Sequence, residues 1–218
     1  MTQKYIKQMA VALLGIAPLL VSNVYATPTT PAITFGQIYQ GGIVFYVDQN
    51  GSHGLIAAMD DQSSEVTWSN VKGDNLGYKV TGTKGDGLYA GAMNTTLIVA
   101  EQMSDNQAGN FAAKVAADYS VQADGVTPCL LGSHNDCYGD WYLPSATELD
   151  KLLQARTVVM GLSVATSYWT STECRTTERS KKCALTLEIE AQTPISTTIS
   201  ASTPLKNTLH AVRAIRQF

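Results

Sequence analysis

A loop between two cysteines in the second half of the chain gathers positive charge. The residues between Cys174 and Cys183 include one acid, Glu178, and four cations: Arg175, Arg179, Lys181 and Lys182. Arginine binds sulfate or carboxylate through paired hydrogen bonds, and lysine binds them as a point charge. The loop is therefore a candidate anion site. The alternative is a solvated hairpin tip whose charges keep it soluble.

Two pairs of adjacent aromatic residues offer a second kind of chemistry. They are Trp141-Tyr142 and Tyr168-Trp169. Exposed aromatic faces stack on sugar rings, so Trp141 and Trp169 are candidate ligand-binding residues. The alternative is packing in the core, with each indole N–H bonded to a buried partner.

Oxygen-bearing side chains that could bind calcium lie in the same half of the chain: Asn135, Asp136, Asp140 and Glu173. Their spacing matches no calcium-binding loop, so calcium is only an alternative, and the sequence predicts no other cofactor. Zinc is disfavoured because no Cys-x-x-Cys pair occurs and the three histidines are scattered.

The first 26 residues have the features of a cleavable signal peptide. Lys4 and Lys7 precede an apolar run over 9–21 that is short for a membrane span, and small residues suit cleavage after Ala26. We expect a polar leader at 27–35 and one domain at 36–218. An uncleaved anchor is the alternative.

Export gives the four cysteines a structural role. In an oxidising compartment disulfides are the default, and of the three pairings we prefer the local ones, Cys129–Cys137 and Cys174–Cys183, because each closes a short loop. We therefore predict a secreted or extracytoplasmic protein, in the periplasm or at the cell surface.

The charge of the expected mature chain excludes some partners. It has 13 basic and 18 acidic residues, which disfavours nucleic acid. No later run of about 18 apolar residues occurs, so no membrane span is predicted after the signal.

Hydrophobic patterns predict the elements that must position these residues. Strands are expected at 43–47 and 54–58, joined by an Asn50-Gly51 turn, at 168–170 and 184–190, and from 209 to near 218. Residues 60–87 are expected to be loop with at most one short strand, and 191–206 are weakly patterned. Strands at both ends with helices between them indicate an α+β fold.

Three helices are expected between these strands. Ala90, Met93, Leu97, Ala100 and Met103 recur at helical spacing, and a second helix is expected from 111 to 119. Ser145 and Glu148 have the spacing of a capping box, so a third helix begins there, with Leu149, Leu152 and Leu153 on one face.

Six blocks in order resemble one family. They are Gly41-Gly42-Ile43-Val44-Phe45-Tyr46-Val47, Gly54-Leu55-Ile56-Ala57-Ala58, Gly139-Asp140-Trp141-Tyr142-Leu143-Pro144-Ser145, Glu148-Leu149, Tyr168-Trp169-Thr170-Ser171-Thr172-Glu173 and Val212-Arg213-Ala214-Ile215-Arg216. This set resembles the C-terminal domain of Legionella collagen-like adhesins, formerly a domain of unknown function. The helix start and the last strand also resemble formylglycine-generating-enzyme domains.

The resemblance implies a C-type lectin-like domain of short, twisted antiparallel strands with two or three helices. It also implies attachment to glycans or glycosaminoglycans, and a trimer by analogy with the collagen-like members. The chain lacks collagen repeats, and its acidic charge argues against strong binding of polyanions.

These observations favour a non-catalytic, adhesin-like module that binds glycans or host or surface macromolecules. One alternative is a structural or interaction protein of the cell envelope without a sugar ligand. A formylglycine-generating-type enzyme is the other, but cysteines paired in disulfides leave no nucleophile, and no Gly-x-Ser-x-Gly or His-Glu-x-x-His motif replaces it.

Overall fold

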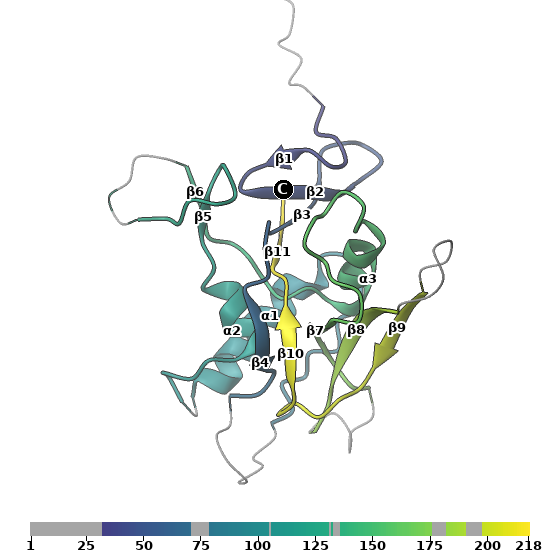
Figure 1. Cartoon of the computed structure of the whole chain (residues 1–218). Helices are drawn as coiled ribbons and strands as arrows, with labels where there is room; N and C mark the ends of the chain where they lie inside the picture. Colours follow the sequence, from purple (N-terminus) through teal and green to yellow (C-terminus); the bar gives the residue numbers. More distant parts are fainter. Residues whose placement is uncertain are drawn as a thin grey trace, which may run out of the picture. The chain divides into compact units, whose positions relative to one another are not determined.

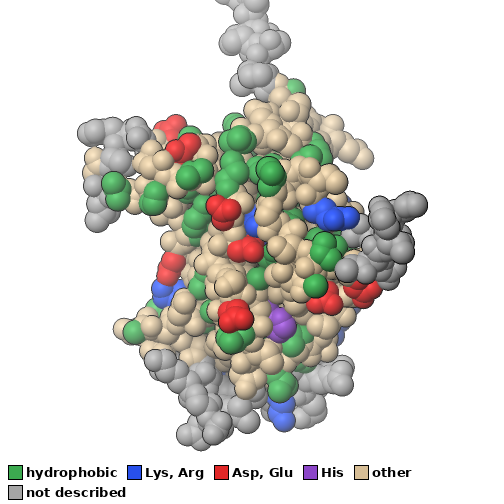
Figure 2. Space-filling view, viewed as in Figure 1, with side chains coloured by type: hydrophobic (Ala, Val, Ile, Leu, Met, Phe, Trp, Pro, Cys, Tyr) green, Lys and Arg blue, Asp and Glu red, His purple; other side chains and the backbone are tan. Residues whose placement is uncertain are grey.

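Helices and short, mostly antiparallel strands form the α+β fold that the sequence predicts (Figure 1). Figure 2 shows hydrophobic and charged side chains scattered over the same face. The computed structural model describes residues 32–70, 79–104, 106–130, 132, 136–175, 182–190 and 198–218. The signal peptide expected at 1–26 and the first residues of the leader lie outside this part of the chain. Among the described residues, no helix is long and apolar enough to cross a membrane.

A four-stranded antiparallel sheet is built around the predicted hairpin. Its strands, in spatial order, are β1 (Ile38–Tyr39), β2 (Gly42–Val47), β3 (Gly54–Ala57) and β11 (Ile215–Gln217). The connection between β2 and β3 runs over residues 48–53, which are the residues that the expected strands leave between them. Asp48 holds this connection, because one carboxylate oxygen accepts the backbone N–H groups of Ser52 and His53 at 3.0 and 3.3 Å.

A five-stranded sheet forms the other half. Its spatial order is β4 (Ser63–Thr67), β10 (Leu209–Val212), β7 (Ser167–Glu173), β8 (Ala184–Glu190) and β9 (Thr198–Ser202). Only β10 and β7 are parallel among the named pairs of this sheet. The strand β9 lies within residues 191–206, whose weak hydrophobic pattern predicted no strand. A third, two-stranded sheet joins β5 (Val121–Gln122) to β6 (Cys137–Tyr138).

The single last strand expected from 209 to near 218 is two strands in different sheets, β10 and β11. The chain leaves the five-stranded sheet after β10 and enters the four-stranded sheet at β11. Arg213 lies at this crossing, almost fully buried, and donates to Asp61 Oδ1 at 2.6 Å and to three main-chain carbonyls. A buried guanidinium needs all of these acceptors, and they fix the place where the strand breaks.

The third helix, α3 (Ala146–Gln154), begins as predicted. Ser145 accepts from the Glu148 backbone N–H, and the Glu148 side chain accepts from the Ser145 N–H, so the capping box is complete. The leucines at 149, 152 and 153 are buried in one cluster with Phe45 of β2 and Tyr168 of β7. The helix thus packs against strands of both main sheets.

The first helix, α1 (Ala90–Met103), has the predicted bounds but buries another face. Met93 and Leu97, expected inside, are 64% and 43% exposed. Polar Asn94, Thr95 and Gln102 are buried instead. They contact irregular segments whose main-chain groups need partners: Gln102, for example, accepts from the Asn70 N–H and donates to the Trp68 carbonyl.

The second helix and the disulfides complete the fold. The helix α2 (Ala112–Ala117) is shorter than expected and begins after buried Phe111. All four cysteines pair as predicted, Cys129 with Cys137 and Cys174 with Cys183, each with Cα atoms 5.8 Å apart. Disulfides of this kind suit an oxidising, extracytoplasmic compartment.

Candidate functional site

Three aromatic side chains from three elements surround a cavity of about 470 Å³. Tyr46 comes from β2, Tyr89 from the residue before α1, and Phe218 from the residue after β11. The other lining residues are Asp48, His53 and Gln217. We call these six residues the aromatic pocket. Its size lies within the usual range for small-molecule sites, roughly 300–1,000 Å³.

The hairpin and the last strand position two of the three aromatic residues. Gly54 and Phe218 exchange two backbone hydrogen bonds of 3.2 Å, which extend the β3–β11 pairing. A Cβ atom at Gly54 would collide with the Tyr46 carbonyl oxygen and with the Phe218 ring. Glycine at this position therefore allows the Phe218 ring to lie close against the hairpin. Tyr39 meets the ring edge-to-face, with centroids 5.5 Å apart.

Tyr89 has a strained backbone. Its φ of 66° and ψ of 6° place it in the left-handed region, where a bulky side chain costs about 1–2 kcal/mol. The Glu148 carboxylate accepts the N–H groups of Tyr89 at 2.7 Å and Gly91 at 3.1 Å, and so holds the residue in this conformation. Strain that the surroundings maintain in this way is common at binding sites.

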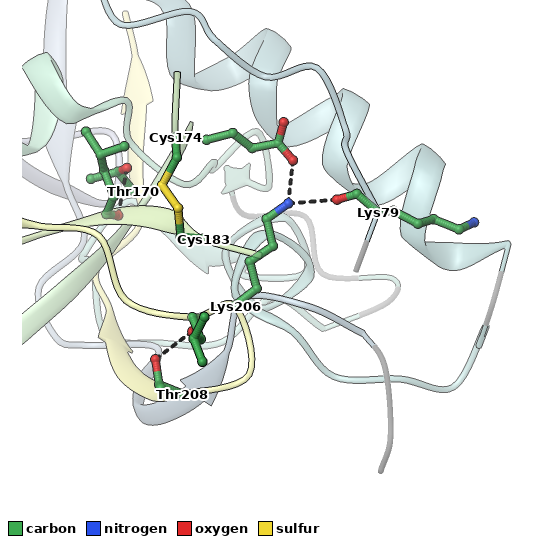
Figure 3. Close-up of a disulfide and its surroundings, with 9 residues drawn as sticks. Lys79, Thr170, Cys174, Cys183, Lys206 and Thr208 are labelled. Carbon is green, nitrogen blue, oxygen red and sulfur yellow. Dashed lines mark hydrogen bonds and ion pairs between the residues drawn. A yellow bond between two sulfur atoms is a disulfide. The ribbon is translucent and has the colours of Figure 1, made fainter. Parts of the chain in front are cut away.

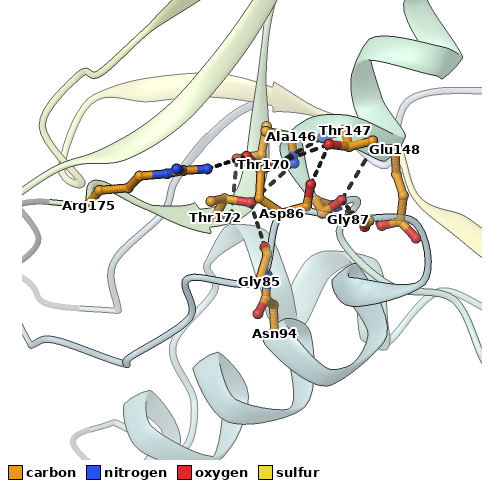
Figure 4. Close-up of polar contacts among 11 residues, drawn as sticks. Gly85, Asp86, Gly87, Asn94, Ala146, Thr147, Glu148, Thr170, Thr172 and Arg175 are labelled. Atoms are coloured by element: carbon orange, nitrogen blue, oxygen red, sulfur yellow. Dashed lines mark hydrogen bonds and ion pairs between the residues drawn. The ribbon is translucent and has the colours of Figure 1, made fainter.

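The segment before Tyr89 is fixed to the same end of α3. Asp86 accepts from the Thr147 N–H at 3.1 Å, and the Gly87 carbonyl accepts from the Ser145 hydroxyl at 2.8 Å. Figure 4 shows Asp86 between Thr147 and Arg175. Residues 86–91 therefore both donate hydrogen bonds to the first turn of α3 and accept hydrogen bonds from it. These bonds fix the backbone that carries the Tyr89 ring.

The Tyr89 hydroxyl is buried, and among the described residues it has no hydrogen-bond partner. Burial is the main reason that its pKa is raised, with smaller contributions from Tyr46, Asp48 and Glu148. A buried hydroxyl without a partner costs about 1–3 kcal/mol. Strain and an unmet hydrogen bond thus coincide at one residue of the pocket.

Other polar groups of the pocket also have capacity for a ligand. Asp48 uses Oδ1 for the turn, and its Oδ2 has no partner in the described part of the chain. The His53 side chain likewise has none there, and the residue is exposed. Next to Gln217, which contributes an amide to the lining, the Tyr142 hydroxyl donates to Glu148 Oε1 at 3.1 Å. Burial raises the pKa of both Tyr142 and Glu148.

A second cavity of about 470 Å³ lies beside α1. Its lining includes Thr95, Asp140 and Trp141, and these polar groups already have protein partners. The aromatic pocket is therefore the better candidate for a ligand.

The residues of the predicted anion loop are only partly described. The Arg175 side chain is 77% exposed and lies 3.2 Å from Asp86 Oδ2, so an acid already neutralises it (Figure 4). Lys182 is exposed. Arg179 and Lys181 lie outside the described residues, so the anion site stays a prediction.

The two candidate tryptophans lie in the core. Trp141 is 2% exposed and Trp169 is 0% exposed. Their indole N–H groups donate to the carbonyls of Tyr138 at 3.0 Å and Val66 at 2.8 Å. This placement favours the packing alternative over sugar stacking, because neither side chain presents a free ring face to solvent.

The candidate calcium ligands do not come together. Asp140 receives two bonds from Arg216, at 2.7 and 2.9 Å, and Glu173 is buried with Lys206. Figure 3 shows Lys206 beside the Cys174–Cys183 disulfide, reaching toward Lys79. Asp136 is exposed, Asn135 lies outside the described residues, and no group of three metal-binding side chains occurs in the described part.

Sequence reasoning missed the aromatic pocket. Tyr46 and Phe218 were part of strand patterns, and Tyr89 preceded a helix. In the sequence, the only local indication of this pocket was an acidic residue, Asp48, directly after a predicted hairpin strand. The pocket itself is formed by three segments that lie far apart in the chain.

Comparison with other proteins gives no family for this chain: a scan against protein-family models found no match, and a search of the curated proteins found no matching relative.

Proposed function

We propose that the chain is a secreted or cell-surface, non-catalytic binding module with a C-type lectin-like fold, and that its aromatic pocket holds a sugar ring of a glycan. The observation that supports this proposal is that three aromatic residues line one pocket, and that one of them, Tyr89, has a strained backbone and a buried hydroxyl without a partner among the described residues. The lectin-like fold is supported by the order of the sequence blocks and by the α+β arrangement.

A sugar ring matches the two kinds of surface in the pocket. Its C–H face is apolar and packs on aromatic rings, while its hydroxyl groups donate and accept hydrogen bonds at the edge. Tyr46, Tyr89 and Phe218 supply the apolar contact area. Asp48 Oδ2 and the Tyr89 hydroxyl supply polar groups without partners among the described residues.

The disulfides support export and argue against catalysis by a cysteine thiol. All four cysteines are paired, which suits a protein that folds in an oxidising compartment. Formylglycine-generating catalysis needs a reactive thiol, and a paired cysteine cannot supply one. The resemblance to that enzyme group is therefore best explained by a shared fold.

A glycan and glycosaminoglycan array with the purified protein tests this function. We expect binding that Tyr46→Ala and Phe218→Ala abolish, because each removes an aromatic wall. Tyr138→Ala, an aromatic change outside the pocket, is the matched control and keeps the signal. An array without any bound glycan would instead favour a structural or interaction protein of the envelope.

A further inference from the structure

Resting on the proposed function, we infer that the aromatic pocket selects a hexose ring that carries no acidic group, with Asp48 as the residue that excludes acidic sugars. Sulfated and uronic-acid sugars would then bind in this pocket much more weakly than their neutral counterparts. Any binding of glycosaminoglycans would depend on another surface, such as the 174–183 loop.

The charges at the pocket carry this inference. Asp48 is the acid among the lining residues, and none of them is a lysine or an arginine. An anionic ligand would therefore face the Asp48 carboxylate without a lysine or arginine to compensate it, and like charges brought together at a binding site reduce affinity.

A cation beside the Tyr46 ring belongs to the neighbouring cavity. Lys151 Nζ lies 5.2 Å from the centroid of the Tyr46 ring. Tyr46 and Lys151 line that cavity together with Phe35, Phe45, Gln154 and Ala155, and Lys151 is not among the residues that line the aromatic pocket. The His53 imidazole also lines the pocket, and it is exposed to solvent.

The hydrogen-bonding capacity points to hydroxyl groups. Asp48 Oδ2 is a charged acceptor, and charged acceptors form strong bonds with hydroxyl donors. The Tyr89 hydroxyl can both donate and accept, as a sugar hydroxyl does. A carboxylate or sulfate ester can only accept hydrogen bonds at neutral pH. It would therefore place a second acceptor beside Asp48, with no hydrogen to form a bond between them.

Asp48→Asn is a conservative test of this inference. Asparagine keeps the Oδ1 atom that accepts the N–H groups of Ser52 and His53, so the connection between β2 and β3 is preserved. The change removes the charge and supplies an amide donor at the second position. Asp60→Asn is the matched control, an exposed acid that does not line the pocket.

The experiment measures dissociation constants by NMR titration of the purified protein. The probes are methyl glycosides of glucose, galactose and mannose, N-acetylglucosamine, and the acidic partners glucuronic acid, galacturonic acid and N-acetylglucosamine 6-sulfate. We expect at least one neutral sugar to bind, with its acidic partner at least tenfold weaker. Asp48→Asn should reduce this ratio to threefold or less, and Asp60→Asn should leave it unchanged.

Each other outcome has a distinct meaning. Acidic sugars that bind as well as neutral ones, with binding lost in Tyr46→Ala, would overturn the selectivity but leave glycan binding in place. A tenfold ratio that persists in Asp48→Asn would overturn the role of Asp48. If no sugar in the set binds and the array is also empty, the proposed function itself fails.

Discussion

Replacing Lys206 with methionine should destabilise the protein strongly. Lys206 and Glu173 are both 0% exposed, with Nζ and Oε1 2.5 Å apart. Lys206 Nζ also donates to the Lys79 carbonyl at 2.7 Å and lies 4.3 Å from the Trp68 ring centroid. Methionine fills similar space but leaves a buried carboxylate without its cation.

The structure sets the size of this effect. Removing one partner of a buried ion pair costs about 3–5 kcal/mol, because the remaining charge is uncompensated. Glu173 retains the N–H groups of Thr81 at 2.8 Å and Gly82 at 3.0 Å, so we expect the lower half of this range. For a chain of this length, about 3–4 kcal/mol lowers the melting temperature by roughly 6–16 °C.

Lys79→Met is the matched control. The Lys79 side chain is 34% exposed and lies 3.5 Å from Glu101, and an exposed pair contributes about 1 kcal/mol or less. Its carbonyl, which Lys206 uses, is unaffected by the change. The two variants therefore differ mainly in the burial of the charge that is lost.

Urea denaturation at pH 7 without reductant measures these differences. We also expect Lys206→Met with Glu173→Gln to recover part of the loss, because no unpaired charge remains. If Lys206→Met costs less than 1 kcal/mol, or the double variant is no more stable than the single one, the ion pair does not stabilise the fold as argued. The double variant can be measured even where the single one does not fold.

Three further predictions concern other parts of the structure. Burial raises the pKa of Glu148, so between the unfolded value of about 4.3 and the folded value only the folded state holds the proton. The contribution of Glu148 to stability is then complete below about pH 4 and is lost as the pH rises through the folded pKa. Calorimetry should show that the difference in stability between wild type and Glu148→Gln shrinks from pH 4 to pH 8. A difference in stability that stays constant over this range contradicts this prediction. Cys174→Ser with Cys183→Ser should reduce the free energy of unfolding by about 2–3 kcal/mol, which equal urea midpoints for variant and wild type would refute. On a heparin column, wild type should elute at higher salt than the variant in which alanine replaces all four loop cations, and equal elution would remove the anion site; the cations are Arg175, Arg179, Lys181 and Lys182.

The sequence predicted the features that depend on residues close together in the chain. The capping box at Ser145 and Glu148 depends on residues three positions apart, and the structure contains it as expected. The paired cysteines also depend on short loops. The sequence did not show that the Glu148 carboxylate also holds Tyr89 and Gly91, because these residues lie far away in the chain.

The buried face of α1 could not be predicted from hydrophobicity. Its pattern places Met93 and Leu97 inside, yet the irregular segments that pack on this helix present main-chain groups. Asn94, Thr95 and Gln102 satisfy these groups, and their hydrogen bonds decide which face is buried. Such partners are visible only once the fold is known.

The strand β9 was missed for a related reason. Its sequence, Thr-Ile-Ser-Ala-Ser, has little hydrophobic alternation because it forms the edge of the five-stranded sheet and buries little. Its pairing with β8 over five residues fixes it instead. The aromatic pocket was beyond prediction because the three walls come from β2, the start of α1 and the end of β11.

The position of β10 and β11 has a consequence for the order of folding. The last segment in chain order pairs with strands made much earlier, with Ile215 opposite Ala57 and Leu209 opposite Thr67. Neither main sheet can therefore be completed until residues 209–217 have left the ribosome, and pairings over such separations form slowly. Until residues 209–217 are made, each main sheet lacks a strand, and a chain in this state is still incompletely folded, as the proposed export requires.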